Sequence, residues 1–405
     1  MNPITIRRSV CAFLFASMFG LTWAAQVEAA SVKILHRFQG ADGQDPQTAL
    51  TLGPDGRLYG TTLTNGQFGR GTVFAIDPNT GELRTLHDFT DQEGSDALGQ
   101  LLLASDGNFY GTTRSGGDDN INCVGGCGTI YRISPSGEFA TVHFTTRAEG
   151  ASLQGGLIEG TDGLLYGTAT VGGSAGCGAA FAFSRSDSKV TVLHSFNCTS
   201  DGRYPYGRLA QASNGLLYGT TSEGAAAEQG TVYQLKTNGS DFRTLVQFAN
   251  ADAGCQPKAG LIQASNGDLY GATESCGTYG GGALYSVTLK GAISAIYHFD
   301  NDGYARDGKN STAELLQGPD GKLYGTAPIG GLPVENPDRS GTVFRVSLKG
   351  TKFKLRHTFM RAPDGSYPTT GLTLGPDGNL YGVTPVGGSD VGFGMGTVYR
   401  LRIVK

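Results

Sequence analysis

Short apolar runs alternate with polar, glycine-rich segments along the chain, and one combination of them recurs seven times. Each copy has an apolar run such as 100–104, then an Asp-Gly or Asn-Gly pair, then Leu-Tyr-Gly-Thr-Thr or a close variant. The tyrosine of that motif stands at positions 59, 110, 166, 218, 270, 324 and 381, so the copies are 51 to 57 residues apart. A period of this length predicts an array of similar structural units.

Each copy predicts four short strands. The apolar run and the Leu-Tyr-Gly-Thr-Thr motif are the first two, and the pair between them adopts positive φ cheaply, which favours a tight hairpin. A Gly-Thr-Val-Phe motif, as at 71–74 and 341–344, is the third strand, and an apolar stretch such as 83–89 is the fourth. Four strands in this order are typical of an antiparallel meander.

The number of copies predicts how the meanders pack. One four-stranded meander cannot bury both of its faces, but seven packed radially can, so we predict an all-β, seven-bladed β-propeller with four-stranded antiparallel blades. The repeats begin with a single fourth-type strand at 31–38 and finish on a third-type strand at 396–403. We therefore expect the N-terminal strand to pair with the C-terminal blade and close the ring.

The first 29 residues do not fit the repeat. Two arginines precede an apolar run at 10–25, and small residues follow at the -3 and -1 positions of a cleavage site. We predict a secretory signal peptide at 1–29 and a single propeller domain at 30–405. The apolar run is shorter than the roughly 20 residues that span a bilayer. We expect an exported protein, secreted, periplasmic or associated with the cell surface, with no membrane span after cleavage.

Composition narrows the class of protein. Glycine supplies 65 of the 405 residues, charged residues make up 16% and hydrophobic residues 39%. These values favour a turn-rich soluble β protein over a disordered or membrane-embedded chain. The net charge of -4 offers no basic surface for nucleic acid. We expect a monomer whose partner is a protein or a carbohydrate.

Six cysteines follow the predicted signal peptide, and an even number in an exported chain favours disulfides over metal or redox chemistry. The propeller order brings two pairs, each 21 residues apart, into adjoining loops, and the other two cysteines share one loop. The predicted pairs are Cys123–Cys127, Cys177–Cys198 and Cys255–Cys276. A zinc site at the first pair is the alternative, but it lacks a second pair of ligands nearby.

Strand order also sorts the loops. The Asp-Gly turns and the third-to-fourth turns lie at one end of every blade. The longer second-to-third loops and the connections between blades lie at the other end, which we call the long-loop face. Variable loops on a rigid scaffold often carry binding residues. The aromatic residues there that are freest to meet a ligand, with loop packing as the alternative, are Tyr204, Tyr206, Tyr279, Tyr304, Tyr367 and Phe393.

Histidine, the commonest general base, suggests no catalytic centre. All six histidines fall in predicted fourth strands close to the terminal phenylalanine, and the repeat spreads them around the ring. They are His36, His87, His143, His194, His298 and His357. We expect them to be structural, and we assign neither a catalytic residue nor a cofactor.

One acidic loop is a weak calcium candidate. Asp300, Asp302 and Asp307 offer hard oxygen ligands in a glycine-turned loop. The alternating ligands and terminal glutamate of an EF-hand loop are missing, and a plain Asp-Gly turn is the simpler interpretation.

The seven Leu-Tyr-Gly-Thr-Thr motifs, each preceded by Asp-Gly or Asn-Gly and followed by a Gly-Thr-Val-Phe type of strand, resemble the GloVer tandem-repeat proteins of bacteria. The resemblance covers the whole chain after the predicted signal peptide. It implies a β-propeller-like, exported surface protein, and members of the family often have interchangeable C-terminal anchors. Residues 402–405 of this sequence offer no sorting motif for such an anchor. The resemblance implies no assigned reaction.

Two functions fit these observations. The first is an exported, non-catalytic binding or scaffold propeller with its partner site on the long-loop face. The alternative is an extracytoplasmic lyase or hydrolase that acts on a polysaccharide or a small cyclic compound at the central channel. An enzyme should have residues that break the repeat symmetry and converge at one mouth of the channel, and a scaffold should not.

Overall fold

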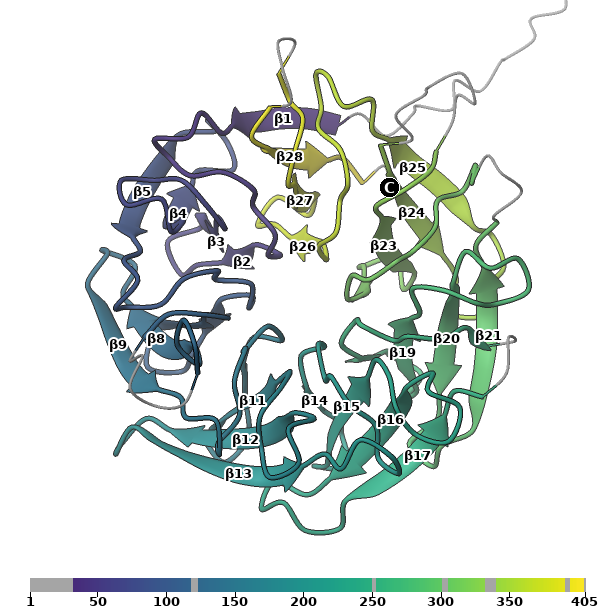
Figure 1. The fold of residues 1–405 in the computed structure, drawn as a ribbon. Helices are drawn as coiled ribbons and strands as arrows, with labels where there is room; N and C mark the ends of the chain where they lie inside the picture. The colour runs from purple at the N-terminus through teal and green to yellow at the C-terminus, as the bar shows by residue number, and fades with distance from the viewer. Residues whose placement is uncertain are drawn as a thin grey trace, which may run out of the picture.

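The computed structural model describes residues 32–117, 123–249, 253–300, 305–331, 340–389 and 394–403. Seven four-stranded antiparallel sheets surround a central axis as the blades of a propeller (Figure 1). The predicted fold class and blade number are confirmed. The predicted signal peptide lies outside the described residues. Among the residues that the structure does describe, no helix has the length and apolar character of a membrane span.

Strand bounds follow the repeat. Blade 1 contains β2 (Thr51–Leu52), β3 (Leu58–Thr61), β4 (Thr72–Ile76) and β5 (Leu83–Asp88). Blade 2 contains β6 (Leu102–Leu103), β7 (Phe109–Thr112), β8 (Thr129–Ile133) and β9 (Phe139–Phe144). Blade 3 contains β10 (Ile158–Glu159), β11 (Leu165–Ala169), β12 (Ala179–Ser184) and β13 (Lys189–Ser195). Blade 4 contains β14 (Ala210–Gln211), β15 (Leu217–Thr221), β16 (Thr231–Leu235) and β17 (Arg243–Gln247). Blade 5 contains β18 (Ile262–Gln263), β19 (Leu269–Ala272), β20 (Ala283–Val287) and β21 (Ile293–His298). Blade 6 contains β22 (Leu316–Gln317), β23 (Leu323–Ala327), β24 (Thr342–Val346) and β25 (Lys354–Thr358). Blade 7 contains β26 (Thr373–Leu374), β27 (Leu380–Thr384), β28 (Thr397–Leu401) and β1 (Val32–Arg37).

The first strand of each blade lies nearest the axis and the fourth lies at the rim (Figure 1). The innermost strands are only two residues long, whereas the rim strands have five to seven residues. Blades converge toward the axis, so a long ladder has room only at the rim. The innermost backbone instead continues into the connection that precedes it.

The chain termini close the ring. Strand β1 pairs antiparallel with β28, in a register that sets Val32 opposite Leu401 and Arg37 opposite Thr397. Val32 and Ile34 pack against the core that blades 6 and 7 share. The predicted closure by the N-terminal strand is therefore confirmed.

The structure explains why an Asp-Gly or Asn-Gly pair and a tyrosine recur together. In blade 1 the buried Tyr59 donates its hydroxyl to Asp55 Oδ2 in the turn, at 2.9 Å. All seven blades have a hydrogen bond between this tyrosine and the turn: the tyrosine donates where the turn residue is Asp, and in blades 4 and 5 Asn214 and Asn266 donate to the tyrosine hydroxyl. This hydrogen bond ties the turn of the first hairpin in every blade to the start of the second strand.

The glycine that follows this tyrosine makes room for the next strand. A Cβ at Gly60 would lie 2.7 Å from the ring of Phe74 on β4. Leu-Tyr-Gly and Gly-Thr-Val-Phe therefore recur as a pair, because the aromatic residue of one strand covers the glycine of the other.

Neighbouring blades share their cores. Tyr59 of blade 1 stacks on Phe109 of blade 2, with ring centroids 4.2 Å apart. The motif threonine, as at Thr61, donates its hydroxyl to a carbonyl of the next blade, here that of Ala97, at 2.9 Å. No blade is an independent unit, which is what radial packing requires.

Five of the six histidines occupy one repeated position, where each contacts an acid in the connection that follows. The contacts are His36–Asp42 at 2.6 Å, His87–Glu93 at 3.3 Å, His143–Glu149 at 3.2 Å, His194–Asp201 at 2.7 Å and His357–Asp364 at 2.6 Å. In blade 5 a tyrosine takes this position, and His298 is the next residue. Each carboxylate fixes the start of a connection at the rim.

Candidate functional site

A six-residue segment runs along the channel just before each first strand, and we call these the inner segments. They are 45–50, 96–101, 152–157, 204–209, 256–261, 310–315 and 367–372. Their second and sixth residues are buried in the blades, while the third residues line the channel. This is the two-residue alternation of extended backbone. The first residue of every inner segment has a positive φ of 57° to 63°, although none of them is glycine.

Each inner segment enters from the long-loop face. Isolated β-bridges join the residue before it to the second-to-third loop of the same blade, as between Gln44 and Thr64 or Arg203 and Glu223. All seven blades make this bridge. The inner segments are therefore fixed at both ends and present their third and fifth residues to the channel from a rigid backbone.

The channel has two connected sections. The section nearer the long-loop face has a volume of about 120 Å³ and is lined by the third residues of all seven inner segments. The deeper section has a volume of about 320 Å³ and continues along the first strands of blades 5 to 7. Gln100, Arg208 and Glu314 line both sections. These side chains therefore lie at the boundary between the mouth and the deeper channel.

The channel-lining residues do not follow the repeat. The third residues, from blade 1 to blade 7, are Gln47, Leu98, Gln154, Tyr206, Lys258, Thr312 and Thr369. The fifth residues, in the same order, are Ala49, Gln100, Gly156, Arg208, Gly260, Glu314 and Gly371. The charged and aromatic members all belong to blades 4, 5 and 6. The mouth is thus asymmetric on a scaffold that is otherwise repeated.

An ion pair joins blade 4 to blade 6 across this mouth. Arg208 Nη2 donates to Glu314 Oε1 at 2.7 Å, and Arg208 Nε donates to Glu314 Oε2 at 3.3 Å. Between them blade 5 has Gly260, where a Cβ would lie 2.8 Å from Glu314 Oε2. The nearby carboxylate raises the pKa of the Arg208 guanidinium. About a quarter of each side chain is exposed.

An aromatic group lies beside this pair. Lys258 Nζ is 5.9 Å from the ring centroid of Tyr206, a cation–π distance, and also bonds to Glu274 at 2.6 Å. The Tyr204 and Tyr206 centroids are 6.4 Å apart. Burial raises the pKa of Tyr206.

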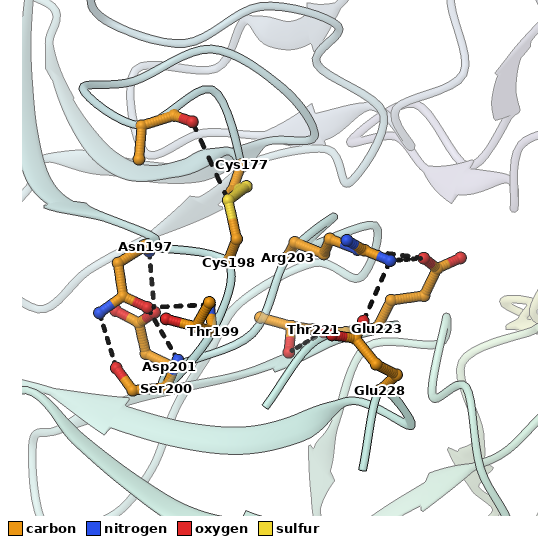
Figure 2. The surroundings of a disulfide bond; sticks show 11 residues. Cys177, Asn197, Cys198, Thr199, Ser200, Asp201, Arg203, Thr221, Glu223 and Glu228 are labelled. Carbon is orange, nitrogen blue, oxygen red and sulfur yellow. Dashed lines mark hydrogen bonds and ion pairs between the residues drawn. A yellow bond between two sulfur atoms is a disulfide. The ribbon is translucent and has the colours of Figure 1, made fainter. Parts of the chain in front are cut away.

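Two disulfides anchor the connections that supply these residues. Figure 2 shows Cys198 bonded to Cys177, with Arg203 further along the same connection facing Glu223 and Glu228. The backbone N–H of Tyr204 donates to the Cys177 carbonyl at 3.1 Å. The disulfide therefore holds the segment that leads into the channel.

The second long disulfide repeats the arrangement one blade further on. Cys255–Cys276 precedes the inner segment that carries Lys258. The third bond, Cys123–Cys127, closes a loop of blade 2. The disulfide pairs are those that the sequence predicts.

The predicted ligand-facing aromatics do not form one group. Tyr206 lines the channel, whereas Tyr204 and Tyr367 stand at the first positions of their inner segments. Tyr279 is 58% exposed in the loop between β19 and β20. Tyr304 and Phe393 lie outside the described residues.

The calcium hypothesis stays a prediction. Asp307 accepts hydrogen bonds from the Tyr297 hydroxyl and from the backbone N–H of Asp300. Burial raises the pKa of the Asp307 carboxyl. Asp302 lies outside the described residues, and within them no group of three His, Cys, Asp or Glu side chains could hold a metal ion.

Sequence reasoning missed Arg208, Glu314 and Lys258. The available signal is the leucine that ends every inner segment, as at 209 and 315. Aligning the copies on that leucine shows that the residues one and three positions before it change chemistry from blade to blade.

Comparison with known families assigns the chain to a protein family. The model of the Gloeobacter/Verrucomicrobia repeat matches residues 15–227 and 211–404. The chain belongs to this family. The GloVer resemblance seen in the sequence is thereby confirmed. A comparison of this Gloeobacter/Verrucomicrobia repeat protein with curated proteins finds no match.

Solved structures share its fold. An extracellular domain assigned to a hybrid two-component system of B. thetaiotaomicron aligns with a TM-score of 0.61 at 9% identity, over 93% of this chain and 40% of that one. The chain therefore spans about two fifths of that relative's length. An oligogalacturonate lyase in complex with manganese aligns with a TM-score of 0.58 at 13% identity, over 93% and 94% of the two chains. A protein assigned as a 6-phosphogluconolactonase from Bacteroides uniformis gives 0.53 at 16%, over 80% and 88%. At these identities the likeness of this repeat protein to them concerns the fold alone.

Proposed function

We propose that the protein is an exported, non-catalytic binding propeller whose ligand occupies the long-loop mouth of the central channel, against blades 4 to 6. One observation carries the proposal. The residues that break the repeat, Tyr206, Arg208 and Glu314 among them, converge at that mouth, while the rest of each blade keeps its repeated contacts. This convergence argues against a scaffold without a ligand, but it is also what an enzyme would have, so the non-catalytic part of the proposal rests on the pairing of the charged side chains at the mouth.

Two features support export. Disulfides persist in oxidising compartments, and three are present. The sequence also predicts a signal peptide. We propose a secreted or periplasmic monomer, and the likeness of its fold to an extracellular domain agrees with that compartment.

The chemistry of the mouth favours binding over turnover. General acid–base catalysis needs a titratable group within reach of the substrate and able to exchange a proton. Glu314 is held by two hydrogen bonds from Arg208, and Lys258 is paired with Glu274. The charged side chains at the mouth are thus already engaged with one another.

A lyase or hydrolase is the second candidate, because convergence of symmetry-breaking residues is also what an enzyme would have. The fold resembles that of an oligogalacturonate lyase, which is compatible with this alternative. Catalysis at this mouth would require Arg208 to leave Glu314, or Lys258 to leave Glu274, and to contact the substrate during turnover.

A ligand screen with matched variants tests the proposal. Thermal-shift screening of wild-type protein against sugars, amino acids, short peptides and uronates should find compounds that raise Tm. Their effect should disappear in Tyr206→Ala and persist in Tyr279→Ala, which changes an exposed tyrosine that does not line the mouth. Equal shifts in both variants would place the ligand elsewhere. Steady release of new products from a polysaccharide by the wild type would establish the enzyme instead.

A further inference from the structure

The cations around the mouth are paired. Lys258 lies 2.6 Å from Glu274, and Arg208 lies 2.7 Å from Glu314. Arg203, which precedes the inner segment of blade 4, lies 3.1 Å from Glu223 and 3.0 Å from Glu228. A charged ligand would have to displace one member of such a pair and leave it uncompensated, which is costly in a partly buried site. An uncharged ligand can bond to the pairs as they stand.

The pairs still have hydrogen-bonding capacity for a neutral ligand. A guanidinium has five N–H donors, and the Arg208 contacts to Glu314 use Nε and Nη2. Its Nη1 donors and the remaining carboxylate lone pairs can meet hydroxyl groups, which both donate and accept. The ion pair thus acts as a fixed planar donor–acceptor unit, not as a free charge.

Amides of blades 1 and 3 extend this polar surface around the channel. Gln47 Nε2 donates to both carboxylate oxygens of Asp45, at 3.0 and 2.9 Å. Gln154 Nε2 donates to Ser152 Oγ at 3.1 Å. Both amides are thereby oriented, and their Oε1 atoms remain as acceptors at the channel lining. Groups held in place before binding lose little conformational entropy when a ligand arrives.

Tyr206 adds an apolar face to this polar ring. A tyrosine combines a rigid aromatic surface with a polar tip, so it can pack on the C–H face of a ring whose edge carries hydroxyl groups. Lys258 Nζ lies 5.9 Å from the centroid of this ring, and the Tyr204 centroid lies 6.4 Å from it. A rigid polyhydroxylated ring fits this combination better than an extended peptide.

The volume limits how much of such a ligand enters. The mouth section, of about 120 Å³, is smaller than the deeper section, of about 320 Å³. Arg208 and Glu314 then cross the channel between the mouth and the deeper section. This space suits one end of a chain and not a polymer that passes through.

From charge pairing, amides, aromatic face and size together, we infer that the mouth binds the terminal residue of an uncharged oligosaccharide. Its sugar ring packs on Tyr206, and its hydroxyls bond to the Arg208–Glu314 pair and to the amide oxygens of Gln47 and Gln154. This inference rests on the proposed binding function and names the ligand class of that site.

Isothermal titration calorimetry with defined hexasaccharides tests the inference. The neutral panel contains gluco-, xylo-, manno- and galacto-oligosaccharides, and the acidic panel contains oligogalacturonate and oligoguluronate. We expect at least one neutral oligosaccharide to bind with a Kd that changes less than twofold between 50 and 500 mM NaCl. The corresponding polymer should bind in proportion to its chain ends.

Variants assign this binding to the mouth. Tyr206→Ala should weaken the affinity at least tenfold, while Tyr206→Phe, which keeps the ring, should stay within threefold of wild type. Gln154→Leu should weaken it three- to tenfold, and Tyr279→Ala should leave it unchanged. Circular dichroism and Tm of each variant show whether it is folded, and the Phe variant serves as the folded reference if the Ala variant is not.

The outcomes separate this inference from the proposed function. Salt-sensitive binding of acidic oligosaccharides alone, abolished in Tyr206→Ala, overturns the neutral-sugar inference and leaves the mouth as the binding site. Binding of a short peptide at the mouth, with no saccharide bound, also overturns the neutral-sugar inference and leaves the mouth as the binding site. Neutral binding that is unaffected by Tyr206→Ala and Gln154→Leu overturns both.

Discussion

Arg208 and Glu314 are 106 residues apart in the chain, yet their side chains meet through two hydrogen bonds across the channel. The contact forms because blades 4 to 6 pack around one axis (Figure 1) and because blade 5 has Gly260 between them. The pair links two blades that are not neighbours. The repeated contacts described above, such as the threonine hydrogen bonds and the aromatic stacking, join adjacent blades.

Breaking one side of this pair should cost more than removing both. Arg208→Met or Glu314→Met leaves a partly buried charge without its partner, and we expect each to lower the free energy of unfolding by about 1–3 kcal/mol. The double variant should recover most of that loss, because no charge is then left alone. Guanidinium denaturation of the three variants measures this coupling. Losses that simply add in the double variant would show that the two residues act independently.

The rim pairs between histidine and acid predict a defined pH dependence. Burial alone would raise the pKa of Asp42, but hydrogen bonds from His36 and from the Gln39 backbone outweigh it and lower the pKa below its usual value. Glu149 behaves in the same way, with His143 and Thr146 as its partners. A depressed folded pKa stabilises the protein at pH values above the unfolded pKa of about 4. That contribution is lost as pH falls through the folded pKa.

The test compares Tm from pH 7 to pH 2. Asp42→Asn and Glu149→Gln should be less stable than wild type at pH 6, and the gap should narrow below pH 4 as the wild-type carboxylates take up protons. Asp187→Asn, a change at an exposed turn residue, should follow the wild-type curve throughout. A gap that stays constant down to pH 2 would contradict the assignment.

The fold was predictable because its determining contacts are local and repeated. Tyr166 and Asp162 are four residues apart, so their hydrogen bond leaves the same spacing in every copy of the sequence. The site was not predictable to the same degree. Its members come from inner segments of different blades, and only the closed ring brings Tyr206, Lys258 and Glu314 to one mouth. The sequence indicates Tyr206 because it is an aromatic residue in a variable loop. It does not indicate Arg208, which stands next to a repeated leucine within an apolar stretch.

Closure of the ring by β1 predicts a strong truncation effect. Removing residues 32–38 strips β28 of its outer partner and takes Val32 and Ile34 from the core of blades 6 and 7. The deletion also removes Phe38, which is 4% exposed, whereas Val32 and Ile34 are partly buried. A fully buried apolar side chain contributes about 1.5–3 kcal/mol, so we expect a loss of at least about 3 kcal/mol and aggregation through the exposed edge. Calorimetry with and without a synthetic peptide of residues 32–38 measures the effect. An unchanged Tm in the truncated protein, or no rescue by the peptide, would count against the closure.

The disulfide next to Lys258 should matter for both stability and binding. Cys255 and Cys276 are 21 positions apart, and in the chain-entropy model a loop of about that length stabilises the fold by about 3 kcal/mol. Replacing both with serine should lower the free energy of unfolding by about that amount. It should also weaken any ligand at the mouth, because the connection that positions Lys258 against Tyr206 is released. The matched control replaces Cys123 and Cys127, which are four residues apart, and should cost less stability and leave mouth binding intact. Equal losses of ligand affinity in the two double variants would mean that the disulfides act on the fold as a whole and not on the channel mouth.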